Sequence, residues 1–193
     1  MYISGRSAVA GVDEVGRGAL FGPVVAAAVV LPQESEAPLA ALGVKDSKRL
    51  TARKREALVG SIQAKAHCFA LGIASVHEID RMNILQASLL AMKRAVSRLS
   101  DKPELCLVDG NQKIPHLDIA QQTLVKGDQT CLAIAAASIL AKVWRDTLIM
   151  RLAERYPGYD LAANKGYGSA RHRAGIARLG LTPQHRKSFK VNS

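Results

Sequence analysis

The spacing of apolar and polar positions in the first part of the chain predicts three strands and one helix. Residues 7–13 alternate weakly, and residues 24–31 form an apolar run rich in valine, so both are typical of strands. The glycine-containing segment between them allows antiparallel pairing. A basic loop leads to residues 51–66, where Thr51 is a suitable N-cap for a helix. Residues 67–75 then predict a third strand.

Helical and strand patterns alternate through the next part of the chain. Residues 84–99 carry an apolar stripe at helical spacing and predict an amphipathic helix. The run 104–110 predicts a short buried strand that ends on Asp109, and the run 118–128 predicts another that ends on Asp128. Each of these two strands therefore terminates at an acid.

The last part of the chain is predicted to be helical. Residues 130–156 form a long helix that is apolar nearly all round in its first half, which suits a central, buried position. A further helix is expected at residues 169–179. An antiparallel start followed by alternating strands and helices indicates an α/β fold with a mixed sheet and helices on its faces. A length of 193 residues favours one domain that spans residues 1–193.

The chain is strongly basic, and its charge is unevenly distributed. It holds 27 lysines and arginines against 16 acids, a formal net charge of +11. Residues 161–193 contain seven cations and no acid, and a second group of cations lies between residues 45 and 55. Such fields attract polyanions, of which nucleic acid is the commonest. On charge alone, a basic protein without a nucleic-acid partner is the alternative.

Features of membrane-spanning and secreted proteins are missing from the pattern. The longest apolar stretch, residues 19–31, has 13 residues and is broken by a Gly-Pro pair, so it is too short to span a bilayer. The amino end lacks the apolar segment of a signal peptide, so we expect a cytoplasmic protein with no membrane partner. The three cysteines have no close pair, which argues against a disulfide framework or a zinc ribbon and predicts buried thiols: Cys68, Cys106 and Cys131.

Three acids stand at predicted strand ends, where open α/β sheets form their sites. They are Asp13, Asp109 and Asp128, and Glu14 is adjacent to the first. Carboxylates gathered at one place repel one another and require divalent cations, and all-oxygen ligands favour Mg²⁺ or Mn²⁺. Any one of these acids alone is more simply a solvated turn residue, but four together on a basic chain predict a metal site that faces phosphate.

One geometric difficulty concerns the neighbours Asp13 and Glu14. Adjacent side chains on a strand point to opposite faces, so the two can share a site only if the strand is bulged or ends there. Gly16 and Gly18 in "GRG" permit either arrangement and allow a ligand to approach the backbone closely. By itself this glycine segment is a weak signal, because it lacks the spacing of a dinucleotide fingerprint or a P-loop.

Six motifs in order resemble those of bacterial ribonuclease HII, a type 2 ribonuclease H. They are "DEVGRG", "DSK", "VDG", "KGD", "AASILAK" and "NKGYG", and the resemblance extends from residue 9 to about residue 189. It implies a ribonuclease H-like fold, with a mixed five-stranded sheet flanked by helices and a C-terminal helical segment. It also implies endonucleolytic cleavage of RNA in RNA/DNA hybrids and of single ribonucleotides embedded in duplex DNA.

The resemblance also implies roles for individual residues. Gly16, Arg17 and Gly18 match a segment that contacts the ribose 2′-hydroxyl largely through main-chain groups. Tyr167 matches the tyrosine that stacks on the sugar of the next, deoxy residue. Lys48 would lie near the bound phosphates, although a solvated loop lysine is an open alternative. The implied metal-binding and catalytic carboxylates are Asp13, Glu14, Asp109 and Asp128.

Two further positions matter less for the chemistry. Asp146 matches a recurrent family acid, for which we expect a place on the helix surface or beside the metal ligands. Leu181 stands where the family usually has a proline after glycine, which leaves the local turn undefined.

The expected reaction is attack of metal-activated water on the 5′ side of a ribonucleotide, which gives 3′-hydroxyl and 5′-phosphate ends. The expected cofactor is Mn²⁺ or Mg²⁺. A monomer is sufficient for this reaction, and residues 161–193 are expected to form a basic substrate-binding segment. Two other classes remain possible on residues alone: a non-catalytic nucleic-acid-binding module, and a phosphotransferase or nucleotide-binding enzyme. The former has no use for four acids, and the latter requires a phosphate-cradling loop that the sequence lacks.

Overall fold

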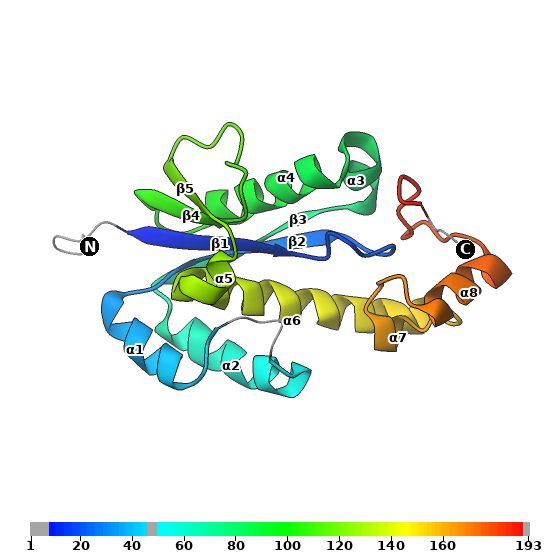
Figure 1. The fold of residues 1–193 in the computed structure, drawn as a ribbon, viewed down its shortest axis with the longest axis horizontal. Coiled ribbons are helices and arrows are strands. Elements are labelled where there is room, and N and C mark those ends of the chain that lie inside the picture. The colour runs from blue at the N-terminus through cyan, green and yellow to red at the C-terminus, as the bar shows by residue number, and fades with distance from the viewer. Residues whose placement is uncertain (1–7, 46–49, 191–193) are drawn as a thin grey trace.

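One mixed sheet forms the centre of the molecule (Figure 1). The computed structural model describes residues 8–45 and 50–190, and in this part of the chain the strands lie in the order β3-β2-β1-β4-β5. The central strand β1 pairs antiparallel with β2 and parallel with β4, so the sheet is mixed as predicted. The strands are β1 (Val9–Val15), β2 (Val24–Val30), β3 (Cys68–Ala74), β4 (Leu105–Asp109) and β5 (Ala120–Leu124).

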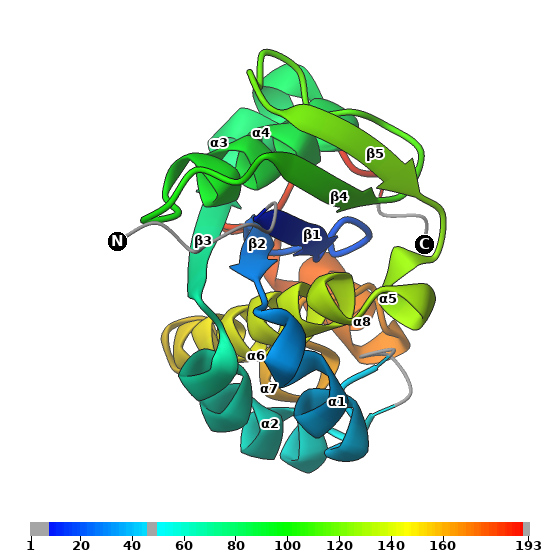
Figure 2. The ribbon, with the colours of Figure 1, turned by 90° about the vertical axis from the view of Figure 1, so that its left-hand side faces the viewer.

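Helices cover both faces of the sheet (Figure 2). α3 and α4 lie on one face, and α6 lies on the other with α1 and α2 beneath it. The helices are α1 (Gln33–Ala41), α2 (Ala52–Lys65), α3 (Val76–Met82), α4 (Ile84–Ser97), α5 (Gly127–Thr130), α6 (Leu132–Arg155), α7 (Leu161–Asn164) and α8 (Ala170–Leu179).

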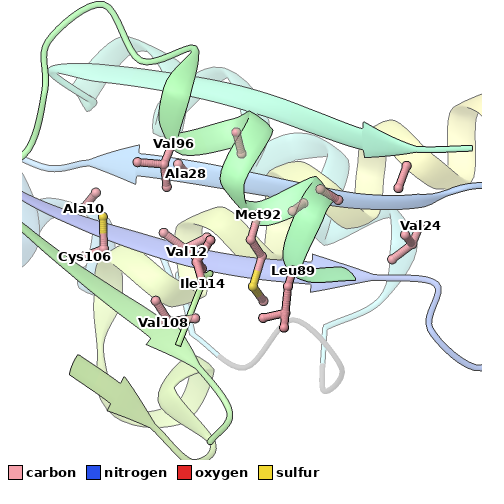
Figure 3. Packing of buried hydrophobic residues seen from close by; sticks show 14 of the residues in the cluster. Ala10, Val12, Val24, Ala28, Leu89, Met92, Val96, Cys106, Val108 and Ile114 are labelled. Carbon is pink, nitrogen blue, oxygen red and sulfur yellow. The ribbon is translucent and has the colours of Figure 1, made fainter. Parts of the chain in front are cut away.

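Strand β2 explains why both faces need a helical cover. Its seven residues are all buried, and alternate side chains enter two different cores. Val24 and Ala28 belong to the core beneath α4, where Figure 3 shows them with Leu89, Met92 and Val96. The alternate β2 side chains, Val25, Ala27 and Val29, belong to the second core, with side chains of α6 and α2. Because burial of one valine or leucine contributes about 1.5–3 kcal/mol, two apolar faces stabilise this three-layer arrangement strongly.

Helix α6 is the long central helix that the sequence predicts, and it approaches β1 very closely. A Cβ atom placed on Gly11 would lie 2.2 Å from the backbone carbon of Ala133, so only glycine fits at this crossing. The first half of α6 consists mainly of small and apolar residues and is almost completely buried. This close packing fixes the position of β1, and therefore of the acids at its end, relative to α6.

Most predicted elements are confirmed, but α1, α3 and the four-residue helices α5 and α7 were not predicted. Residues 32–50 were predicted as a basic loop, whereas α1 occupies part of that segment although Pro38 lies within it. α3 was not predicted, although a capping box marks its start: the Ser75 hydroxyl accepts the Glu78 N–H, and the Glu78 carboxylate accepts the Ser75 N–H. α3 has only seven residues, too few for its apolar period to stand out.

The predicted strand at residues 118–128 is too long, and the prediction that Asp128 ends it is wrong. β5 ends at Leu124, and Lys126 then adopts a left-handed conformation with φ of 56°. Asp128 lies on the short helix α5 instead. The Gly127 N–H donates to the Asp109 carboxylate at 2.7 Å, which turns the chain back toward β4. Asp128 therefore approaches the sheet from α5 and not along a strand.

The prediction of buried cysteines holds for two of the three. Cys68 and Cys106 are buried, but Cys131 at the N-cap of α6 is partly exposed. No helix among the described residues is both long enough and apolar enough to cross a membrane.

Candidate active site

The end of β1 extends beyond its neighbour β4, and this places two acids at the sheet edge. The last β1–β4 pair is Val12 with Val108, whereas the ladder between β1 and β2 continues to Val15. Asp13 and Glu14 therefore lie where one side of β1 is free of β4, and Asp109 is the last residue of β4. The register brings Asp109 next to Asp13.

Asp13 points toward α6 and is almost completely buried. Its carboxylate accepts the Glu14 N–H at 2.7 Å and a hydrogen bond from the hydroxyl of Ser138 on α6. Burial raises the pKa of Asp13 well above its usual range, and the negative charges of Glu14 and Asp109 raise it further. This acid is thus held in a place that disfavours its ionised form.

Glu14 points to the opposite face of the sheet, toward α4. Its side chain lines a small cleft of about 50 Å³ together with Arg17, Asp109 and Asn111. Burial raises the pKa of Glu14, the Arg17 guanidinium at 3.4 Å lowers it, and Asp109 raises it again. Neither of the two expected arrangements, a bulge or a strand end, occurs at these acids, because the ladder with β2 is regular at both and continues to Val15. Instead β4 ends early, so Asp109 interacts with Asp13 and Glu14 from the strand end.

Asp128 is the fourth predicted acid, and it is buried beside this group. It is 1% exposed, and its chain neighbour Gly127 donates directly to the Asp109 carboxylate. The structure therefore connects Asp109 and Asp128 through the backbone at the start of α5. The charges of Asp13, Glu14 and Asp109 influence one another. Asp128 is placed near Asp109 by the hydrogen bond of its chain neighbour Gly127.

These carboxylates fit a divalent cation by their chemistry. Two of them have raised pKa values because of burial and mutual repulsion, which a cation would relieve, and oxygen donors match Mg²⁺ or Mn²⁺. Among the described residues, His67, Cys68 and Asp101 form the group whose possible ligand atoms all lie within 4.8 Å of one another. The oxygens of the four acids are farther apart than that. Asp13 and Glu14 point to opposite faces of β1, which accounts for part of that spread.

The segment from Gly16 to Gly18 lies on the turn after β1. Gly16 has φ of +91°, and a Cβ atom there would lie 2.2 Å from Nε of Arg145, so a side chain is excluded twice. Gly18 has no atom within 4 Å of its Cβ position and faces open space. The Arg17 side chain is half exposed and pairs with Glu14. Arg17 and Gly18 are therefore accessible to a ligand, whereas Gly16 is buried against Arg145.

Two buried arginines that the sequence analysis missed hold this turn in place. Arg145 of α6 donates to the carbonyl oxygens of Pro23 at 3.0 Å, Phe21 at 2.9 Å and Lys165 at 2.9 Å. Arg186 of the C-terminal segment donates to the Gly22 oxygen at 3.0 Å and to the Arg17 oxygen at 2.9 Å. Arg145 lies within a helix and Arg186 within a basic segment, where arginines are normally surface residues, so the sequence offered no signal for either role.

Tyr167 lies against the same turn. Its backbone forms a bridge with Ala19, and its ring is 5.5 Å from the Arg145 guanidinium and 5.5 Å from the Lys142 ammonium. Lys142 also pairs with Asp146 at 3.0 Å, which places Asp146 on α6 near this ring and agrees with its expected place on the helix. Lys48, the remaining predicted substrate contact, lies outside the described residues.

One further polar group in the cleft was not predicted. The Ser88 hydroxyl of α4 is buried, has no hydrogen-bond partner among the described residues and lines the cleft that contains Glu14. Its position lies on the apolar stripe of residues 84–99, where the periodicity concealed it.

Comparison with known proteins gives one consistent result. The sequence model described as "Ribonuclease HII" matches residues 10–192. Ribonuclease HII of Trichodesmium erythraeum is 66% identical over 180 residues, which are 93% of this chain and 85% of that protein. Ribonuclease HII of Acaryochloris marina is 64% identical over 181 residues, 94% of this chain and 91% of that protein.

A solved structure supports the same conclusion for the fold. The crystal structure of ribonuclease H2 from Pyrococcus horikoshii OT3 superimposes with a TM-score of 0.80 at 28% identity, and covers 95% of this chain and 94% of that one. The predicted ribonuclease H-like fold is therefore confirmed.

Proposed function

The chain belongs to the ribonuclease HII family, and from that premise we propose that it incises on the 5′ side of ribonucleotides embedded in duplex DNA. Membership makes it a metal-dependent hydrolase of phosphodiester bonds that acts on RNA/DNA hybrids. The proposal adds the junction specificity, the roles of individual residues and the products, which are 3′-hydroxyl and 5′-phosphate ends.

We assign the catalytic carboxylates to Asp13, Glu14, Asp109 and Asp128, as ligands of Mn²⁺ or Mg²⁺. Two such ions, when bound, activate water and stabilise the leaving oxygen of a phosphodiester. The observation that carries this assignment is a group of three acids at one sheet edge, of which Asp13 is buried and Glu14 and Asp109 are partly buried. Burial first, and then the charge of the neighbouring acids, raises the pKa values of Asp13 and Glu14. Both acids must ionise to bind a cation, so binding releases protons at pH values below their raised pKa values.

The turn after β1 is proposed to recognise the ribose. Arg17 and Gly18 are exposed, so their main-chain groups can reach a 2′-hydroxyl. Gly16 is buried against Arg145, and we propose that it completes this segment through its main chain. Arg145 and Arg186 fix the carbonyl groups of this turn from two sides. Their hydrogen bonds limit the movement of the turn, which favours discrimination between ribose and deoxyribose.

Tyr167 is proposed to contact the sugar of the adjacent deoxynucleotide. The Arg145 and Lys142 cations lie near its ring and hold it beside the turn. The basic segment 161–193 is proposed to bind phosphates. Arg186 is buried and serves the fold, whereas the cations of this segment that the structure shows as exposed are Arg171, Arg173, Arg178, Lys187 and Lys190.

We further propose that residues 1–193 act as one catalytic domain, as a monomer and in the cytoplasm. All four proposed carboxylates come from a single chain, so no second subunit is needed for the chemistry. Lys48 remains a predicted phosphate contact.

A cleavage panel tests the proposed function. The substrates are an all-DNA duplex, an RNA/DNA hybrid and a DNA duplex with one ribonucleotide, each incubated with Mn²⁺, with Mg²⁺ or with neither. We expect cleavage of the hybrid and one nick on the 5′ side of the single ribonucleotide, only with a divalent ion. A 2′,3′-cyclic phosphate among the products would show that the ribose hydroxyl is the nucleophile and would contradict the proposal.

Asp109→Asn is the matched variant. It keeps the shape of the side chain and one oxygen that can accept from Gly127, so folding and hybrid binding should persist while turnover is lost. Retained turnover in this variant would show that the assignment of Asp109 is wrong.

A further inference from the structure

Three side chains that carry metal-ligand atoms meet at the end of the sheet opposite the carboxylates. His67 precedes β3, Cys68 begins it, and Asp101 lies in the loop between α4 and β4. A ring nitrogen, the thiol sulfur and a carboxylate oxygen of these residues all lie within 4.8 Å of one another. This cluster plays no part in the proposed reaction.

Strand register separates the two places. Cys68 pairs with Val30, which pairs with Ala10 near the start of β1. Asp13 and Glu14 lie three and four positions further along β1, toward its other end. A ligand at one place is therefore not a ligand at the other.

Backbone and side-chain hydrogen bonds hold the cluster together. The His67 N–H donates to the Val30 carbonyl at 2.9 Å, which fixes the backbone next to Cys68. Nε2 of His67 lies 2.9 Å from Oδ2 of Asp101, and the Ser100 hydroxyl donates to the same oxygen at 3.2 Å. The imidazole and the carboxylate are thus already oriented toward one another.

We propose that His67, Cys68 and Asp101 bind a divalent transition metal, with Zn²⁺ as the expected ion. One nitrogen, one sulfur and one oxygen form a donor set of intermediate softness, which suits Zn²⁺ and is unlike the all-oxygen set that suits Mg²⁺. Cys68 is 8% exposed, whereas the His67 and Asp101 side chains are 30% and 62% exposed. Ions can therefore enter from solvent, and water can supply a fourth ligand.

The required rearrangement is small. Tetrahedral ligands at about 2.0–2.3 Å from zinc lie roughly 3.3–3.8 Å from one another. The donor atoms here lie within 4.8 Å, so a shift of about 1 Å is enough, and the exposed Asp101 carboxylate can provide it. Cys68 must lose its thiol proton to solvent as the sulfur–metal bond forms, so binding should weaken as the pH falls.

The simpler alternative is an ion pair between His67 and Asp101 beside a core cysteine. Cys68 does pack in the apolar core beneath α4, which this alternative requires. The two explanations differ in one respect: only the metal site requires the sulfur atom to form a bond. A spectroscopic signal from the sulfur therefore separates them.

Cobalt is the probe for the test. Co²⁺ is titrated into the full chain with excess Mg²⁺ present, so that the all-oxygen carboxylate site is occupied by the harder ion. A thiolate bound to Co²⁺ gives a charge-transfer absorption in the near ultraviolet, which carboxylates and imidazoles do not give. We expect this absorption to appear and to disappear again when Zn²⁺ displaces the cobalt.

Three variants localise the signal. Cys68→Ser should abolish it, and Asp101→Asn, at an exposed position, should weaken Co²⁺ binding about tenfold or more. Cys131→Ser is the matched control, because Cys131 is the partly exposed cysteine nearest Asp128 in sequence, and it should leave the absorption unchanged. Circular dichroism checks that each variant folds. If Cys68→Ser does not fold, the affinity of Asp101→Asn decides.

The inference is overturned if the unmodified chain shows no thiolate absorption, if the absorption persists in Cys68→Ser, or if it is lost in Cys131→Ser. Unchanged Co²⁺ affinity in Asp101→Asn would overturn it equally. Hybrid cleavage by Asp101→Asn should equal that of the unmodified chain, so failure of this inference and failure of the proposed nuclease function are distinguishable.

Discussion

Replacement of Arg145 by alanine should destabilise the protein more than replacement of any exposed cation. The guanidinium is completely buried and joins three segments: α6 itself, the turn after β1 through Phe21 and Pro23, and the C-terminal segment through Lys165. Arg145→Ala would leave these three carbonyl groups without their donor.

The expected loss follows from the contacts. A hydrogen bond to a charged group contributes about 1.5–3 kcal/mol net, so three bonds give roughly 4–9 kcal/mol if they add. Burial of the guanidinium charge is unfavourable, and it lowers the pKa of Arg145. The alanine variant no longer buries this charge, which offsets part of the free energy lost with the three hydrogen bonds. We therefore expect a loss of about 4 kcal/mol, which for a chain of this length lowers the melting temperature by roughly 8–16 °C.

Urea denaturation followed by circular dichroism measures this loss directly. Arg151→Ala is the matched control, because Arg151 lies on the same helix and is exposed, and it should cost less than about 0.5 kcal/mol. Arg145→Lys keeps the charge but not the planar fork and should fall between the two. A loss for Arg145→Ala below about 1 kcal/mol would refute the structural role assigned here.

Further predictions concern binding, the turn and pH. If about five or six phosphates are contacted, a plot of the logarithm of the hybrid binding constant against the logarithm of salt concentration should have a slope near −5. A filter-binding assay measures this slope. A binding constant that does not change with salt would show that the basic segment does not bind the phosphates. Gly16→Ala places a Cβ atom 2.2 Å from Nε of Arg145, at a residue whose φ is +91°. We therefore expect urea denaturation to show a stability loss of roughly 2–3 kcal/mol, and the rate of hybrid cleavage to fall tenfold or more. Wild-type values for both would contradict this description of the turn. Burial, and then the charge of His172, lowers the pKa of His185 from 6.5 to about 4, so its contribution to stability is complete above pH 6.5 and is lost as the pH falls toward 4, by up to about 3 kcal/mol. Denaturation of the wild type and His185→Asn at each pH should show this difference shrinking on acidification, and a constant difference would oppose it.

Periodicity was sufficient to predict the frame of the fold. The apolar run of β2 and the nearly all-apolar start of α6 reflect burial on every side, so their sequences leave little choice of structure. The acids Asp13 and Asp109 were found because strand ends are recognisable and converge in such sheets. The way in which Asp109 lies beside both Asp13 and Glu14 required coordinates, since only the register shows that the β1–β4 pairing stops at Val12 and Val108.

Contacts between distant segments were the part that periodicity could not predict. Arg145 looks like any helical cation, and its role depends on carbonyl groups more than 120 residues away in the sequence. Asp128 was expected at a strand end because residues 118–128 were interpreted as a single strand, but β5 ends at Leu124 and the left-handed Lys126 follows. The acids of the site could thus be found from sequence, while the groups that hold its turn could not.

The central claim is that buried carboxylates at one sheet edge form a divalent-cation site, and the titration of Asp13 tests it most directly. With isotope-labelled aspartate, the carboxyl carbon shift of Asp13 is followed against pH by NMR, without and with Mg²⁺, and Asp13→Asn identifies the signal. The account predicts a pKa well above the ordinary value without Mg²⁺, because of burial and the neighbouring acids, and a marked fall when Mg²⁺ is added. An ordinary pKa that Mg²⁺ leaves unchanged would contradict it.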